Sequence, residues 1–308
     1  MSPVDTNVID AAELDLVRGS LRHALDTNSA STVVGALLSE GWAELCEAAP
    51  AQAITALAEQ AGGARSSAPV ADLAVLWGAG VAADPTTAVL HDGLALAGAE
   101  RAERFVTLTA DGVAGVPAAA VVLRPVRGID PALGLARATV DPGATVALGG
   151  PAEAAAALDA GRRALASQMV GAADRMLVDT LAYVQERHQY GRAIGSFQTV
   201  KHRLADVKVA ITAARSATRA AWEVADTDDG PLAAMAAKAL AGRAQQIAST
   251  HCYQVHGGIA FTVEHGFQQW VRRGLVLDRL LGGHEHLTRE VGARLIATGR
   301  VPRVPQLS

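Results

Sequence analysis

The chain has 308 residues, of which 50% are apolar, 19% are charged and 4% are aromatic. This composition supports a sizeable core of alanine, leucine and valine, and it favours helices because alanine loses no side-chain entropy on ordering. The formal net charge of -4 argues against a nucleic-acid surface, which needs a basic stripe. Cys46 and Cys252 have no metal or redox spacing, the acidic N-terminal segment lacks a signal region, and no apolar run is long enough to span a membrane. We therefore expect a cytoplasmic protein without a membrane span.

Residues 1–84 are predicted to form a helical domain. Apolar residues recur at helical spacing in the first segment, at Leu14, Val17, Leu21 and Leu25. Further helices are expected over residues 32–46, 51–61 and 70–80. The turn signal Ala83-Asp84-Pro85 ends the domain.

Residues 85–150 are predicted to form a small β domain. Short segments of strand type cover residues 88–96, 105–110, 118–123 and 136–140. Turn sequences such as Asp111-Gly112 and Asp141-Pro142-Gly143 separate them.

Residues 151–303 return to long helices. Pro151 suits the first position of a helix, and Gly257-Gly258 suit the end of one. The expected helices cover residues 151–187, 197–225, 231–255, 262–281 and 284–297. Long helices joined by short connections predict an antiparallel bundle.

Four short motifs stand out in this last region. In chain order they are Arg187-His188-Gln189-Tyr190-Gly191 with Ile194 and Phe197-Gln198, then Gln254-Val255-His256-Gly257-Gly258, then Arg272-Arg273, and then Leu281-Gly282-Gly283-His284-Glu285-His286. Each alone has an ordinary structural explanation, such as an arginine near a helix end or glycines that stop a helix. Their order and spacing together are more specific.

As a set, these motifs resemble those of the acyl-CoA dehydrogenase family. The first resembles its Arg-x-x-(Phe/Tyr)-Gly-x-x-Ile-x-x-Phe-Gln signature, and the second its Gln-x-x-Gly-Gly. The fourth stands where that family has a Tyr-Glu-Gly-Thr segment. The resemblance covers about residues 151–300 well and residues 1–150 weakly. It implies a mainly α fold with a small β unit: a trimmed N-terminal helical domain, a small middle β-barrel domain and a C-terminal four-helix bundle.

The resemblance also implies an FAD-dependent activity. Such enzymes introduce an α,β double bond into an acyl-CoA thioester: a carboxylate removes the α-proton and FAD takes the hydride. The matching positions imply cofactor contacts at Arg187, Tyr190, Gln198, Gln254, Gly257, Gly258 and Gly283. In this family such contacts reach the flavin of a neighbouring subunit, which implies an oligomer.

The family's base is missing at both places where it could stand. One place lies in Leu158-Asp159-Ala160-Gly161-Arg162 and holds Gly161, and the other holds Gly282. A glycine cannot take a proton. Substitutes are Glu285 first, then His284, and Asp159, which points to the opposite helix face.

The loop that covers the flavin ring in the family is also absent. The chain therefore resembles the smaller, base-lacking subunit of the α2β2 acyl-CoA dehydrogenases of steroid degradation, cholesterol degradation included. This implies an unlike partner that carries the base, a steroid-derived acyl-CoA substrate and an acceptor such as an electron-transfer flavoprotein.

Two alternatives stay open: a homo-oligomeric dehydrogenase that uses Glu285, and a flavin-free structural subunit. A metal site is not indicated, because the C-terminal histidines lack ligand spacing. A Cys252–His256 nucleophile lacks a third orienting group.

Overall fold

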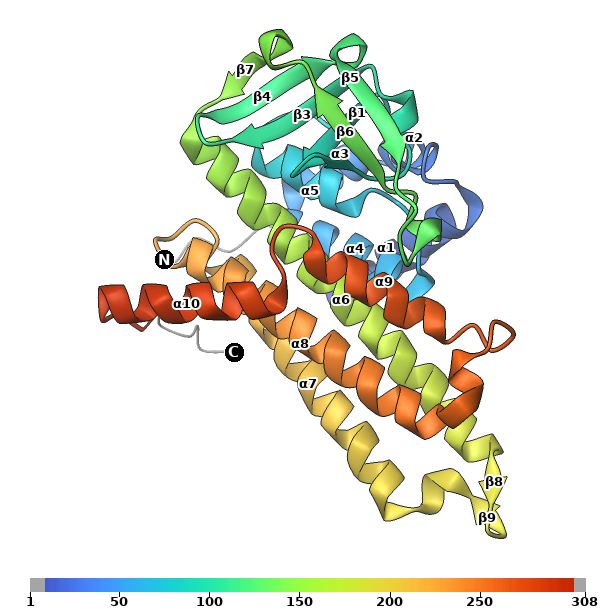
Figure 1. The fold of residues 1–308 in the computed structure, drawn as a ribbon. Helices are drawn as coiled ribbons and strands as arrows, with labels where there is room; N and C mark the ends of the chain where they lie inside the picture. Colours follow the sequence, from blue (N-terminus) through green and yellow to red (C-terminus); the bar gives the residue numbers. More distant parts are fainter. Residues whose placement is uncertain (1–8, 302–308) are drawn as a thin grey trace. The chain divides into compact units, whose positions relative to one another are not determined.

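The computed structural model describes residues 9–301, which divide into two compact units between Ala164 and Leu165 (Figure 1). Residues 1–8 and 302–303, the outer ends of the predicted first and third domains, lie outside the described range. The fold is mainly helical with a small β unit, as predicted. No helix in the described part combines the length and hydropathy that a membrane span requires.

The first unit begins with five helices: α1 Ala11–Thr27, α2 Val33–Ser39, α3 Trp42–Ala48, α4 Pro50–Ala64 and α5 Val70–Gly78. Asp10 caps α1, since its carboxylate accepts from the Glu13 amide at 2.9 Å. The single helix predicted over residues 32–46 is wrong. Gly41 has φ +88 between α2 and α3, and this left-handed conformation ends the first of them.

The sheet of the first unit has seven strands in the order β5-β6-β2-β1-β3-β4-β7. They are β1 Thr87–His91, β2 Leu94–Ala95, β3 Arg104–Thr109, β4 Gly112–Pro117, β5 Val121–Pro125, β6 Ala136–Val140 and β7 Val146–Gly149. The pair β1–β3 is parallel and the other pairs are antiparallel. The single strand predicted over residues 88–96 is wrong, because Asp92 and Gly93 have positive φ and reverse the chain between β1 and β2.

A buried carboxylate ties the helices of this unit to its sheet. Asp72 of α5 meets the ring Nε2 of His91 at 2.7 Å and accepts from the Val89 amide at 3.0 Å. Both side chains are buried, so pairing removes the penalty of leaving either polar group without a partner.

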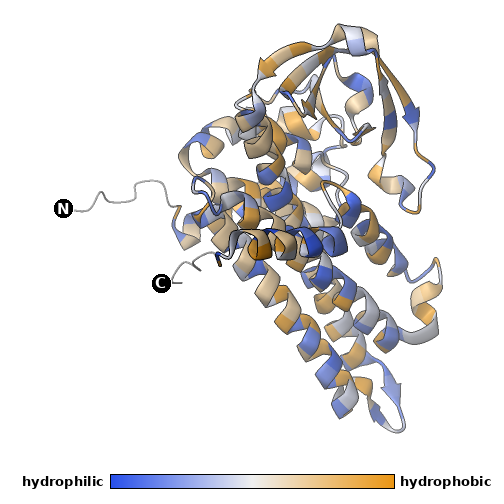
Figure 2. Cartoon of the chain, turned by 60° about the vertical axis from the view of Figure 1, so that its left-hand side comes forward, coloured by the Kyte–Doolittle hydropathy of each residue, from blue (hydrophilic) through white to orange (hydrophobic). Residues whose placement is uncertain are grey.

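The second unit is a helical bundle. α6 Pro151–Glu186 crosses the boundary, and α7 Gln198–Glu223, α8 Gly230–His256, α9 Gln268–Arg279 and α10 His284–Thr298 follow. α7 and α8 pack along each other through small buried residues such as Ala214 and Ala244. Figure 2 shows hydrophobic and hydrophilic residues alternating around these helices, as one buried face requires.

The helix predicted over residues 262–281 starts too early. A 3-10 turn, η6 Gly257–Phe261, follows α8, and Gly266 has φ +70 before α9 begins at Gln268. Because the left-handed conformation cannot continue a helix, the residues from Thr262 to Gly266 form a turn.

Candidate functional site

The first motif forms a small exposed hairpin at the end of α6. Strand β8 (His188–Gln189) pairs with β9 (Arg192–Ala193), and Tyr190 and Gly191 make the turn with φ +54 and +78. Positive φ at both central residues is the geometry of a tight two-residue hairpin, which explains the glycine. The side chain of Tyr190 at the tip is 91% exposed.

Side chains of the hairpin and of the start of α7 face outward. The Arg192 guanidinium lies 4.2 Å from the centre of the Phe197 ring, and Tyr190 meets the same ring edge-on at 6.2 Å. Gln198 opens α7 and contacts the His202 ring at 2.8 Å. Arg187 is exposed, and no carboxylate of residues 9–301 pairs with its guanidinium. The fold therefore leaves this charge available to a ligand.

The second motif ends α8. Gln254 is exposed on the last turn, and Gly257 leaves the helix with φ +69. A Cβ at Gly257 or at Gly258 would meet no atom within 4 Å. Gly257 is needed for its backbone conformation, but packing within this chain does not explain Gly258. An exposed backbone without side chains is what close approach of a phosphate requires.

A buried histidine brings the two motifs to one end of the bundle. His256 stacks on Tyr183, with centroids 4.3 Å apart, and Tyr183 lies one helical turn before Arg187 on α6. The Nε2 of His256 lies 3.1 Å from the Thr180 hydroxyl, and its Nδ1 lies 2.8 Å from Nε2 of His265. Burial, with a smaller contribution from His265, lowers the pKa of His256 to about 4.

The fourth motif lies elsewhere along the bundle. Lys238 of α8 is fully buried, and its ammonium donates to the carbonyls of Asp278 at 2.9 Å and Gly282 at 3.3 Å. The Asp278 carboxylate accepts from the His284 amide at 3.0 Å and meets its Nδ1 at 2.9 Å. Lys238 precedes Gln254 by 16 residues on one helix, which is about 24 Å at 1.5 Å per residue. The first and second motifs therefore form one site at the end of the bundle, and the fourth motif lies at a separate position.

The backbone at Gly282 excludes a side chain. Its φ is +106, and an added Cβ would lie 2.9 Å from Cδ2 of Leu287. Gly283, by contrast, has φ -72 and caps α10. A glutamate placed at Gly282 would therefore be strained and would meet the Leu287 side chain.

The other predicted base position also holds no titratable group. Gly161 is buried within α6 in the first unit. Its neighbour Asp159 is buried and pairs with Arg162 at 3.4 Å. Glu285 is exposed in the first turn of α10, where no apolar pocket surrounds it. Gly161 has no proton-accepting group, the buried Asp159 carboxylate is held in an ion pair with Arg162, and the Glu285 carboxylate is not desolvated as a general base in this chemistry is.

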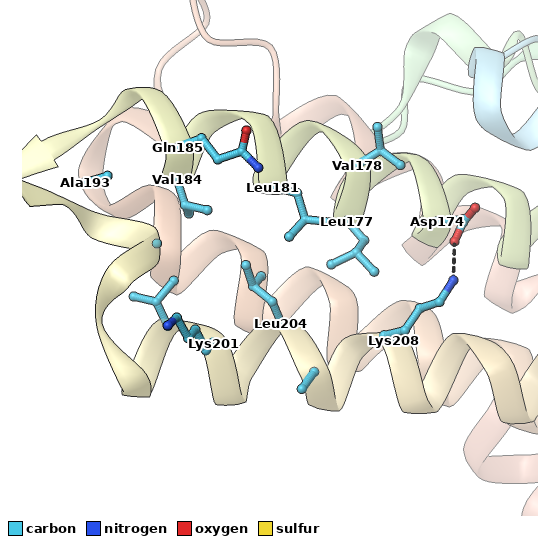
Figure 3. Close-up of a pocket in the computed structure, with 13 residues that line it drawn as sticks. Asp174, Leu177, Val178, Leu181, Val184, Gln185, Ala193, Lys201, Leu204 and Lys208 are labelled. Atoms are coloured by element: carbon cyan, nitrogen blue, oxygen red, sulfur yellow. Dashed lines mark ion pairs between the residues drawn. The ribbon is translucent and has the colours of Figure 1, made fainter.

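An apolar groove of about 620 Å³ runs between α6 and α7 (Figure 3). Its walls include Leu177, Val178, Leu181 and Leu204, and Lys208 at one end pairs with Asp174 at 3.7 Å. The groove has few polar groups, so it offers a surface for packing and no arrangement for acid–base chemistry.

The residue types at these positions fit an anionic dinucleotide: a guanidinium without an ion pair in residues 9–301, an exposed amide, an exposed aromatic ring and an open glycine pair. Sequence reasoning missed Lys238, Asp278 and the surroundings of His256. The partners in these contacts are up to 76 residues apart, as for Thr180 and His256, so no local spacing signals them.

Comparison with known proteins agrees with this architecture. Residues 149–296 match the family described as "Acyl-CoA dehydrogenase, C-terminal domain". Acyl-CoA dehydrogenase IpdE2 of Mycolicibacterium smegmatis is 37% identical over 161 residues, which are 51% of this chain and 49% of that protein. Acyl-CoA dehydrogenase FadE34 of Mycobacterium tuberculosis is 35% identical over 225 residues, 70% of this chain and 31% of that protein. The chain thus spans about half or less of the length of these relatives.

Solved structures share the fold over nearly the whole chain. The Tcur3481-Tcur3483 steroid ACAD G363A variant has a TM-score of 0.77 at 23% identity and covers 94% of this chain and 98% of its own. The ChsE4-ChsE5 complex from Mycobacterium tuberculosis has a TM-score of 0.73 at 19% identity and covers 96% and 99%. At these identities the likeness concerns the fold alone. The protein therefore has the acyl-CoA dehydrogenase fold, and its residues 149–296 are similar to the C-terminal domain of the acyl-CoA dehydrogenase family.

Proposed function

We propose that the chain is one subunit of an FAD-dependent acyl-CoA dehydrogenase, in which an unlike subunit supplies the catalytic base. The substrate would be a steroid-derived acyl-CoA, and an electron-transfer flavoprotein would accept the electrons. Relatives and structural neighbours support this: FadE34 and IpdE2 are acyl-CoA dehydrogenases, and two neighbours are titled as a steroid enzyme and as a two-protein complex.

One contrast supports the division of work between subunits. The motif at the end of the bundle exposes Arg187, Gln254 and Gly258, and within residues 9–301 the Arg187 guanidinium has no ion pair and a Cβ at Gly258 would contact nothing. The motif that would hold the base is instead closed by Gly282 and Leu287. A chain with cofactor contacts but no base suits an assembly in which the two are shared.

Within such an assembly this chain binds and orients. Arg187 would donate parallel charge-assisted hydrogen bonds to a phosphate or ribose, and Gln254 and Gly257-Gly258 would approach the pyrophosphate. Tyr190 and Gln198 would lie on the adenosine side, and Gly283 near the cofactor from the other motif. FAD, when bound, would accept the hydride from the β-carbon. The exposed apolar groove between α6 and α7 supports an assembly too, because such surfaces are usually covered by a partner.

The test is to express the chain alone and together with an unlike acyl-CoA dehydrogenase subunit encoded beside it. We expect flavin absorbance and acyl-CoA oxidation only in the co-expressed complex, with both chains in one peak by native mass spectrometry. A yellow, active homo-oligomer of this chain would contradict the proposal and favour Glu285 as base. A stable mixed complex that never holds flavin would favour a structural subunit.

A further inference from the structure

The ring of His256 packs against two aromatic rings and has a polar neighbour at each nitrogen. The Tyr183 ring stacks on it, with centroids 4.3 Å apart and 27° between the ring planes. The Phe267 ring lies 4.5 Å away by centroids, with 35° between the planes. The two nitrogens meet Thr180 and His265. The ring is 5% exposed. So complete an enclosure leaves one orientation for the imidazole.

The direction of the hydrogen bonds follows from the carbonyl of Met176. The Thr180 hydroxyl lies 2.7 Å from this oxygen, and a carbonyl can only accept. The single hydroxyl proton therefore goes to Met176, and the Thr180 oxygen must accept from His256. Nε2 of His256 consequently carries its proton, and Nδ1 accepts from Nε2–H of His265.

We propose that Thr180 and His265 are positioning residues that hold His256 as a neutral ring of this one tautomer, and thereby hold the turn that follows α8. His256 is the last residue of α8, and its carbonyl accepts from the Tyr183 hydroxyl at 3.5 Å. Gly257 and Gly258 come next and have no side chains that could fix the position of this turn. The part of the inference that concerns the cofactor rests on the proposed function.

The hydrogen bonds that link Thr180, His256 and His265 tolerate an added proton on His265 but oppose a further one on His256. A proton on Nδ1 of His265 leaves its Nε2–H donor in place, so the contact to His256 persists. A proton on His256 as well would put two cations and two facing N–H groups together. Two other titratable groups lie at the ring: Tyr183 on α6, and Cys252 one turn earlier on α8. The Cys252 thiol also has a hydrogen bond with the Thr180 hydroxyl. No carboxylate of residues 9–301 bonds to the ring.

Two pairs of variants separate the role of the hydrogen bonds from that of bulk. His265→Gln keeps an amide N–H near the position of Nε2, whereas His265→Leu removes the donor. Thr180→Ser keeps the hydroxyl, whereas Thr180→Val removes it at nearly the same volume. His286→Leu, at an exposed position on α10, is the control for a lost histidine.

The first measurement uses the full chain without flavin. ¹⁵N NMR of the imidazoles should show His256 protonated on Nε2 at neutral pH, and its titration should move to higher pH in the order wild type, His265→Gln, His265→Leu. Amide exchange in Gly257–Phe261 should rise at least about tenfold in His265→Leu and Thr180→Val and stay near wild type in the conservative variants. A His256 protonated on Nδ1 at neutral pH in the wild type would overturn the proposal, even if a variant fails to fold.

The second measurement is flavin retention by the co-expressed complex. Retention should fall in His265→Leu and Thr180→Val and recover in His265→Gln and Thr180→Ser, with Arg187→Ala as the reference for a lost cofactor contact. Faster exchange with unchanged retention in these variants, while Arg187→Ala loses flavin, would overturn only the link to the cofactor. Unchanged retention in Arg187→Ala as well would instead count against the proposed function.

Discussion

Lys238 donates its fully buried ammonium to the main-chain carbonyl of Gly282 at 3.3 Å. A lysine in the middle of one helix thus holds the loop that the resemblance predicts as one of the two base positions. Asp278 completes the arrangement, with one carboxylate oxygen 3.9 Å from the ammonium and its carbonyl at 2.9 Å.

Lys238→Met should destabilise the protein strongly. The change leaves the Gly282 and Asp278 carbonyls and the Asp278 carboxylate short of a buried partner, and breaking a buried pair costs about 3–5 kcal/mol. Denaturant unfolding of the chain measures the difference. Lys201→Met, at an exposed position of α7, is the matched control, for which we expect the free energy of unfolding to change by no more than about 0.5 kcal/mol. Equal effects at the two sites would refute a clamping role for Lys238.

Gly282→Glu should not create a base. Positive φ costs a non-glycine residue about 1–2 kcal/mol, and the new Cβ would press on Leu287, which adds about 1–3 kcal/mol. We expect lower unfolding stability and no acyl-CoA oxidation by the chain alone. Gly258→Ala is the counterpart, since its surroundings are open: stability should hold while flavin retention by the complex falls. Activity gained by Gly282→Glu would show that the loop is more adaptable than its geometry indicates.

Acid should destabilise the fold through His256. Its pKa is about 4 when folded against an ordinary 6.5, so on acidification the unfolded state takes up the proton first. The stabilisation is complete above pH 6.5 and is lost as the pH falls toward 4, about 3 kcal/mol in all. His256→Asn lacks this titration, so its free energy of unfolding should fall by about 2–3 kcal/mol less between pH 7 and pH 4.5. Parallel losses in both proteins would assign the acid sensitivity to carboxylates alone.

The long helices were predictable because their apolar stripes continue over many turns. α6 runs over Pro151–Glu186 where residues 151–187 were expected, and α8 over Gly230–His256 where 231–255 were expected. The hairpin motif and the glycine pair were recognised through their resemblance to the family's motifs. The structure adds that Arg187, Tyr190 and Gln198 are exposed.

Other elements depend on distant partners and left no local pattern. Strand β4 has the sequence Gly-Val-Ala-Gly-Val-Pro, whose two glycines and proline disfavour a strand, and its pairing with β3 overrides this. A lysine is expected at the surface, and only the fold brings Lys238 to Asp278, 40 residues along the chain. His256 occupies an unspecified position of the Gln-x-x-Gly-Gly motif, and no sequence pattern indicates that Thr180 and His265 lie beside it.

Glu285→Gln should leave turnover of the assembled enzyme nearly unchanged. The carboxylate is exposed at the start of α10, and the proposal places the base in the partner. Steady-state oxidation of a steroid acyl-CoA by the co-expressed complex measures this. General-base catalysis contributes about 10²–10⁴-fold, so a loss of that size would identify Glu285 as the base and support the homo-oligomeric alternative.

Arg187→Ala should weaken flavin retention by the complex without destabilising the chain. The guanidinium makes no ion pair within residues 9–301, so its removal takes nothing from the fold. Loss of a charge-assisted hydrogen bond costs about 1.5–3 kcal/mol, or roughly 10–150-fold in the dissociation constant of FAD. Fluorescence titration of the deflavinated complex measures the constant, and thermal unfolding of the chain measures stability. Arg175→Ala is the matched control. Arg175 is exposed on α6, the helix that precedes Arg187, and forms an ion pair with Asp179 at 2.8 Å. Equal weakening by both changes would reduce the effect to one of net charge, whereas weakening confined to Arg187→Ala would assign the contact to the hairpin motif.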